Sequence, residues 1–164
     1  MNASRPQTIL FADVSGSTRL FESKGDVEAR RLIAAVLEAL TQVCRQHGGR
    51  VIKTIGDEVM CTFPGALNGI LAACDMQRRM GRDINFVRDS LAVRIGLHHG
   101  DALEEEDGDV YGDAVNTASR MESHGQAGKI QVSNEVRRAL QGRFRLEPRG
   151  NIDVKGKGPM ATWF

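Results

Sequence analysis

The sequence lacks any long apolar run. No window approaches the roughly 18 apolar residues that cross a bilayer, and the polar start, Met1 to Thr8, has no apolar core of the signal-peptide kind. Cysteine is scarce: the three residues, Cys44, Cys61 and Cys74, are odd in number and lack metal-ligand spacing. Each has apolar neighbours, which predicts buried free thiols. These absences predict a cytoplasmic chain without a membrane-spanning segment.

An excess of charge of one sign is also missing. The formal net charge is +1, so the field of the whole chain does not attract nucleic acid or an anionic membrane, and we expect neither as a partner. Any phosphate chemistry must come from local placement of charge. Internal repeats, low-complexity stretches and linkers are absent as well. The 164 residues therefore predict a single domain over 1–164.

Apolar periodicity predicts the order of strands and helices. The order is βαββαβ, followed by an αβ unit and further strands. It predicts an α+β sandwich with a ferredoxin-like core, a mainly antiparallel sheet with helices on one face, and the other face free for a partner or substrate. The predicted strands are 8–13, 50–55, 58–63, 91–98, 129–132, 144–147, 152–154 and 161–164, and the predicted helices are 26–47, 66–80, 115–122 and 134–140.

Two aspartates are the first candidates for chemistry. Asp13 ends a predicted buried strand, and Asp57 follows Gly56 in the two-residue loop of a predicted hairpin. Two carboxylates brought together in space can hold divalent cations, which activate a hydroxyl nucleophile and neutralise a phosphate leaving group. Aspartate is also a common turn residue. Spacing alone favours the turn interpretation and leaves the metal site as its alternative.

Three segments are candidates for phosphate binding, and each also has an ordinary structural interpretation. The turn Gly16-Ser17-Thr18 enters a helix and offers backbone N–H groups to phosphate oxygens, or it is a simple helix cap. Asn116 and Arg120 share a helical face, where the arginine could clamp a phosphoryl group or face solvent. Lys155 and Lys157 lie in a glycine loop that suits a polyphosphate or an ordinary surface turn.

Taken together, these segments resemble the class III adenylate and guanylate cyclases, in order and from about Thr8 to Phe164. Any single match would be weak, but five in the correct order are highly specific. The resemblance implies the catalytic domain of a homodimeric enzyme that uses two divalent metal ions, Mg²⁺ or Mn²⁺. The matching stretches are FADVSGSTRLFE, RVIKTIGDEVMCTF, VRIGLHHGDA, DVYGDAVNTASRME and VKGKG.

The resemblance implies a role for each matching residue. Asp13 and Asp57 match the metal-binding aspartates, and the carbonyl of Val14 would complete one metal shell. Lys53 and Asp109 match the pair that reads the purine in adenylate cyclases.

The remaining matches concern the ribose and the phosphates. Asn116 would orient the ribose, and Arg120 would meet the reacting α-phosphate. Arg94 and Lys155 match cationic residues that hold the triphosphate. By the same resemblance, the two metal aspartates and Arg94 face the other catalytic residues across the dimer interface.

The implied reaction converts ATP into 3′,5′-cyclic AMP and pyrophosphate. Adenine offers an amino donor to Asp109 and an acceptor to Lys53, whereas guanine reverses this pattern, so the pair favours ATP. The alternatives are a guanylate cyclase, a diguanylate cyclase suggested by Gly56-Asp57-Glu58, and a catalytically silent nucleotide-binding or dimerising regulatory domain. The full set of catalytic matches favours catalysis. Regulatory domains fused to this one would be compatible with it.

Overall fold

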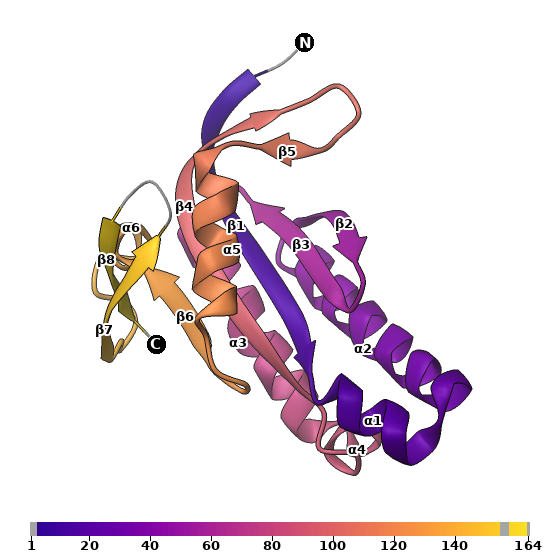
Figure 1. The fold of residues 1–164 in the computed structure, drawn as a ribbon. Coiled ribbons are helices and arrows are strands. Elements are labelled where there is room, and N and C mark those ends of the chain that lie inside the picture. Colours follow the sequence, from indigo (N-terminus) through magenta and orange to yellow (C-terminus); the bar gives the residue numbers. More distant parts are fainter. Residues whose placement is uncertain (1–2, 155–157, 164) are drawn as a thin grey trace.

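A computed structural model describes residues 3–154 and 158–163, which form an eight-stranded sheet (Figure 1). The strand order is β2-β3-β1-β4-β6-β8-β7, and β5 pairs with β4 off this path. The pair of β4 and β6 is parallel and the other pairs are antiparallel. The strands are β1 Ala3–Ser15, β2 Arg50–Ile55, β3 Glu58–Phe63, β4 Ala92–Glu104, β5 Val110–Tyr111, β6 Ile130–Ser133, β7 Pro148–Val154 and β8 Gly158–Trp163. The helices are α1 Ser17–Lys24, α2 Asp26–Gln46, α3 Ala66–Arg82, α4 Ile84–Val87, α5 Asp113–Ser123 and α6 Asn134–Leu140.

The predicted mixture of helices with a mainly antiparallel sheet is confirmed. The hairpin of β2 and β3 turns through Gly56 and Asp57, as its two-residue loop predicts. The strand predicted over 144–147 is wrong, because these residues are irregular and β7 begins only at Pro148. Phe144 and Leu146 pack against the main core from this irregular segment, which accounts for their apolar alternation.

The main core lies between one face of the sheet and helices α2, α3 and α6. On β1, Leu10, Ala12 and Val14 point into it, and Val93, Ile95 and Leu97 on β4 do the same. Their period of two is that of a strand with one face toward a core. Cys44 and Cys61 are buried within this core, and Cys74 packs against it half-buried, all three as free thiols.

The second face of the sheet is not free, which corrects the prediction that helices cover one face only. Helix α5 lies across this face, opposite α2 and α3 (Figure 1). Ala114 and Ala118 of α5 pack with Ile9, Phe11 and Met60 of the sheet in a second, smaller core. β1 is apolar at successive residues because it is buried on both faces.

Helix α5 approaches β4 closely at Gly96. A Cβ atom built on Gly96 would stand 2.1 Å from the backbone nitrogen of Glu122 and 2.6 Å from its Cα. Only a residue without a side chain allows this contact, because backbone atoms cannot rotate out of the way. The glycine therefore sets the height of α5 above the sheet.

None of the helices in the described residues is both long and apolar enough to span a bilayer.

We predict that Gly96→Ala destabilises the protein, because the added methyl group meets the backbone of α5. The cost should reach at least the ~1–3 kcal/mol typical of overpacking, measured by urea unfolding. Gly81→Ala is the matched control: Gly81 is an exposed residue of α3, and a Cβ there meets nothing within 4 Å. This control should gain roughly 0.5–1 kcal/mol from helix propensity. Equal stability of the two variants would contradict the close contact.

Candidate functional site

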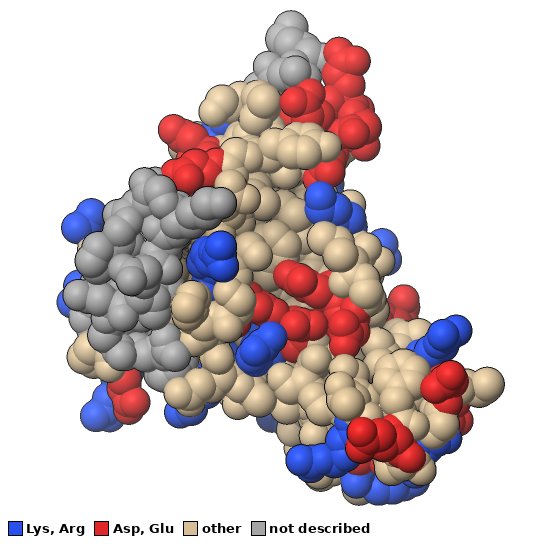
Figure 2. Space-filling model, viewed as in Figure 1, with Lys and Arg blue, Asp and Glu red and all other residues tan. Residues whose placement is uncertain are grey.

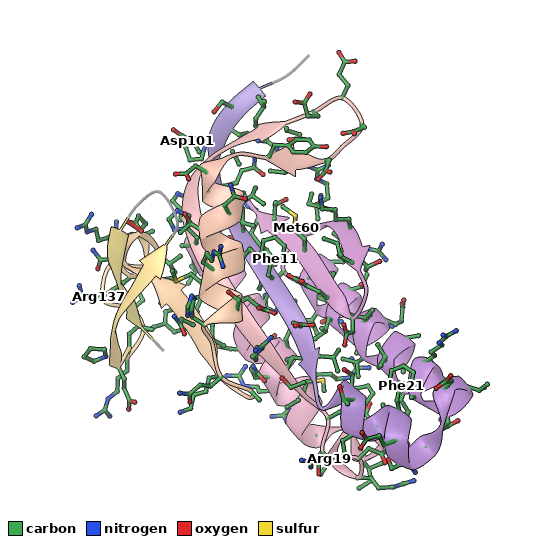
Figure 3. All side chains as sticks on the ribbon, in the orientation of Figure 1. Phe11, Arg19, Phe21, Met60, Asp101 and Arg137 are labelled. Carbon is green, nitrogen blue, oxygen red and sulfur yellow. The ribbon has the colours of Figure 1, made fainter. Side chains whose placement is uncertain are left out.

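Three charged residues form a row across the middle of the sheet. Asp13 on β1 is paired with Glu58 on β3 and with Arg94 on β4. They lie on the face that α5 covers, because Asp13 alternates with Ala12 of the main core and so shares its face with Phe11 of the second core. Figure 3 labels Phe11 on this face, beside α5. Arg94 Nη2 donates a hydrogen bond of 3.1 Å to Asp13 Oδ2. The strand register therefore creates a charged row beside α5.

The tip of the hairpin brings Asp57 to this row. The N–H of Val14 donates to the carbonyl of Asp57 at 3.0 Å, which continues the pairing of β1 beyond Asp13. The structure thus gathers Asp13, Val14 and Asp57, the three residues predicted to bind metal, at one end of β1. Their role as metal ligands stays a prediction.

Glu122 of α5 completes this carboxylate cluster, which we define as Asp13, Asp57, Glu58 and Glu122. The residue is only 4% exposed, and its Oε1 lies 3.8 Å from Arg94 Nη2. Burial, a hydrogen bond with Asp13 and the charge of Asp13 together raise the pKa of Glu122 to about 8, against the opposing effect of Arg94.

Negative charge is concentrated throughout this cluster. Burial raises the pKa of Glu58, and the charges of Asp13 and Asp57 add to the effect. Figure 2 shows acidic side chains gathered in the middle of the face beside α5. Carboxylates that repel one another in this way gain when a cation binds between them, and their hard oxygens suit Mg²⁺ or Mn²⁺.

The turn that follows β1 has the geometry predicted for it. Gly16 precedes α1 in the left-handed conformation, with φ 90°, which favours glycine. Ser17 opens α1 and Thr18 follows, so the first N–H groups of this eight-residue helix lie a few residues after Asp13. Such groups have no acceptor within the helix and suit an anion.

Lys53 and Asp109 meet although 56 residues separate them along the chain. Lys53 Nζ on β2 donates to Asp109 Oδ2 at 3.1 Å, and the other carboxylate oxygen accepts the N–H of Val110 at 2.8 Å. Burial acts to raise the pKa of Asp109, but the hydrogen bonds from Val110 and Lys53 outweigh it and hold that pKa below its usual value. The Lys53 ammonium also lies 5.9 Å from the centre of the Tyr111 ring. These contacts hold the two side chains against each other.

A second ion pair holds the segment that carries Asp109 against β2. Arg50 Nη2 on β2 lies 2.9 Å from Glu104 Oε1 on β4, and Arg50 Nη1 donates to the carbonyl of Gly108 at 3.4 Å. These contacts join the hairpin to the segment that carries Asp109. They fix the position of the predicted purine-reading pair.

Asn116 and Arg120 lie apart from this cluster. Both are exposed on α5, whereas Ala118 and Glu122 on the same helix are buried against the sheet. The structure places the two predicted transition-state residues together on one outward surface, but it does not bring them onto the carboxylate cluster of the same chain. Lys155, predicted to hold the triphosphate, lies outside the described residues.

The sequence interpretation missed Glu58 and Glu122. A local signal was present for Glu122, because it follows the small residue Ala118 by four positions and so shares the packed face of the helix. No pattern within β3 marks Glu58 as a neighbour of Asp13, because that proximity depends on the register between two strands.

Comparison with known proteins places the chain among nucleotide cyclases. A family model of the adenylate and guanylate cyclase catalytic domain matches residues 1–164. The chain is 35% identical over 170 residues to an adenylate cyclase of Mycobacterium tuberculosis strain H37Rv, covering 96% of this chain and 38% of that protein. It is 30% identical over 179 residues to the guanylate cyclase soluble subunit beta-2 of Rattus norvegicus, covering 96% of this chain and 25% of that protein.

A solved structure has the same fold over almost the whole chain. The catalytic core of a rhodopsin-guanylyl cyclase with converted specificity, in complex with ATPαS, matches with a TM-score of 0.91 at 26% identity, covering 99% of this chain and 97% of the other. Relatives of both nucleotide specificities are therefore similar to this chain. The chain spans less than two fifths of the length of either curated relative, at 38% and 25%.

Proposed function

Because the chain belongs to the family of adenylate and guanylate cyclase catalytic domains, we propose that it converts ATP into 3′,5′-cyclic AMP and pyrophosphate at the interface of a homodimer. The observation that carries the choice of ATP is the hydrogen-bonded pair of Lys53 and Asp109. Relatives of both specificities are similar to the chain, so the choice depends on this pair. Guanylate cyclase is the alternative.

The pair presents one acceptor and one donor to a base. Asp109 can accept from the 6-amino group of adenine, and Lys53 can donate to N1. The 6-oxo group of guanine would face a carboxylate that cannot donate, and an unmatched buried polar group costs about 1–3 kcal/mol. The low pKa of Asp109 keeps this carboxyl group an acceptor at neutral pH.

The cluster suits two divalent cations, which Asp13, Asp57 and the carbonyl of Val14 would hold. Burial and the charges of Asp13 and Asp57 raise the pKa of Glu58, and the part due to these charges supports this fit. No three acidic, histidine or cysteine side chains among the described residues form a ready-made ligand group, so water and phosphate oxygens would supply the remaining ligands. When bound, the cations lower the pKa of the ribose 3′-hydroxyl and neutralise the leaving phosphates.

The chain's own groups position the substrate and stabilise its charge. Arg94 and the N–H groups at the start of α1 would bind the triphosphate beside the cluster, together with Lys155. Asn116 would orient the ribose, and Arg120 would meet the negative charge that develops on the α-phosphate. Fixed charge at that point typically contributes several kcal/mol, about 3–4 for one donor. The in-line attack on phosphorus needs little covalent help from the protein.

The division of the site supports a dimer. Asn116 and Arg120 are exposed and apart from the cluster of their own chain, so a second copy would have to bring its cluster to them. A two-fold axis would then create two equivalent sites. Each would combine the cluster and Arg94 of one protomer with Asn116, Arg120 and the purine pair of the other. A cytoplasmic location and fused regulatory domains stay predictions.

Incubation with ATP or GTP, each with Mg²⁺ or Mn²⁺, tests this function directly. We expect cyclic AMP and pyrophosphate from ATP, identified by chromatography, and little cyclic GMP from GTP. Preferential turnover of GTP would establish the guanylate cyclase alternative. A folded protein that turns over neither nucleotide with either metal would be a silent regulatory domain.

The purine pair is tested by the double variant Lys53→Glu and Asp109→Cys. It removes the donor for N1 and the acceptor for the amino group, so the ratio of kcat/KM for ATP over GTP should fall by about tenfold or more, the equivalent of one unmatched hydrogen bond. Arg78→Lys in the exposed ion pair with Asp75 on α3 is the control and should keep the ratio. An unchanged ratio in a still-active double variant would contradict the assignment.

Complementation tests the composite site. Asp13→Ala and Arg120→Ala homodimers should each be nearly inactive, and in a mixed dimer one site carries both changes while the other carries neither. With free exchange half of the dimers are mixed, so an equal mixture should recover roughly a quarter of the wild-type rate. Recovery should increase with total protein concentration, because assembly obeys mass action. Demonstrated subunit exchange without recovered activity would refute the shared site.

A further inference from the structure

Arg94 and Glu122 each have a buried polar atom without a hydrogen-bond partner. Arg94 Nε and Glu122 Oε1 are both buried, and neither makes a hydrogen bond. Arg94 Nη2 lies 3.1 Å from Asp13 Oδ2 but 3.8 Å from Glu122 Oε1, which is beyond hydrogen-bond distance. Arg94 thus has an unused donor and Glu122 an unused acceptor, on two side chains whose Nη2 and Oε1 atoms lie 3.8 Å apart.

Such a pair is costly in the state that the structure shows. A buried polar group without a partner costs about 1–3 kcal/mol, and more than 90% of buried groups have one. Gly96 lets the backbone of Glu122 lie against β4, and the Glu122 side chain is only 4% exposed, so it stays on the side of α5 that faces the sheet. A small movement of the Arg94 side chain toward α5 would satisfy both groups.

We propose that Glu122 is a positioning residue that receives Arg94 when Asp13 turns to bind a cation. This inference rests on the proposed function. Asp13 cannot serve a guanidinium group and a metal equally well, so Arg94 would lose its present acceptor when a metal binds. The fork of Nε and Nη2 matches both oxygens of a carboxylate, and such bidentate pairs are strong and well oriented. Glu122 then keeps Arg94 at the triphosphate instead of letting it extend into solvent.

The role predicts a specific pattern of effects. Glu122 does not touch the nucleotide, so it acts on triphosphate affinity only through Arg94. A variant of Glu122 should therefore raise KM more than it lowers kcat. Its effect should vanish when Arg94 is already absent.

A double-mutant cycle on nucleotide binding tests the proposal. The ligand is 3′-deoxy-ATP with Mn²⁺, which binds but cannot cyclise, and its Kd is measured by calorimetry for the wild type, Glu122→Gln, Arg94→Ala and the double variant. We expect Glu122→Gln to weaken binding about tenfold in the wild-type background and less than about twofold in the Arg94→Ala background. Equal losses in the two backgrounds, or no loss in the first, would overturn it.

Controls separate this inference from the proposed function. Glu38→Gln, the same change on the exposed surface of α2, should leave the Kd unchanged. Circular dichroism checks folding, and Glu122→Asp replaces Glu122→Gln in the cycle if the latter fails to fold. Wild-type turnover of ATP is measured in parallel, so its absence would refute the proposed function alone. The same double-mutant cycle can be measured on the thermal unfolding midpoint, without nucleotide. The non-additivity of the Glu122 and Arg94 changes should be larger in Mn²⁺ than in EDTA. Equal non-additivity under the two conditions would overturn the proposal.

Discussion

Helix α5 rests on the backbone of β4 at Gly96, and the arrangement of the site depends on this contact. A side chain at that position would lift the helix, since a Cβ would stand 2.1 Å from the nitrogen of Glu122. The contact fixes the rotation of α5 as well as its height. Glu122 is turned into the sheet, and Asn116 and Arg120 are turned outward. One glycine thus decides which charged groups meet within a single chain.

The cluster beneath α5 stores electrostatic repulsion. Strand register and a helix bring four carboxyl groups together, and burial together with the neighbouring Asp13 raises the pKa of Glu122 to about 8. Arg94, which donates a hydrogen bond to Asp13, neutralises only part of this negative charge. A site of this kind costs stability in the free protein and gains it when a cation binds, which is a common relation between stability and function.

The sequence predicts local features of this fold well and contacts between distant segments poorly. The hairpin through Gly56-Asp57 and the helix around Asn116 follow from turn chemistry and periodicity. The prediction of a free sheet face was wrong. The continuous apolar run of β1 is the pattern of a strand that is buried on both faces, and it was not used in that prediction. The meeting of Lys53 with Asp109 spans 56 residues, and only the family resemblance pointed to it. Glu122 was missed because its neighbours, Asp13 and Arg94, lie on two strands that are distant from α5 in the sequence.

The separation of the groups within one chain gives assembly a direct part in activity. The carboxylate cluster proposed to bind metal lies apart from Asn116 and Arg120, the outward residues of α5 in the same chain. If two chains supply the two halves, an isolated protomer holds the metals but cannot complete the transition state. Activity would then follow the population of dimers, and any domain that shifts the monomer–dimer equilibrium would control the rate without touching the substrate. In that case the burial of Glu122 and the exposure of Arg120, two residues apart on α5, are complementary consequences of the same packing at Gly96.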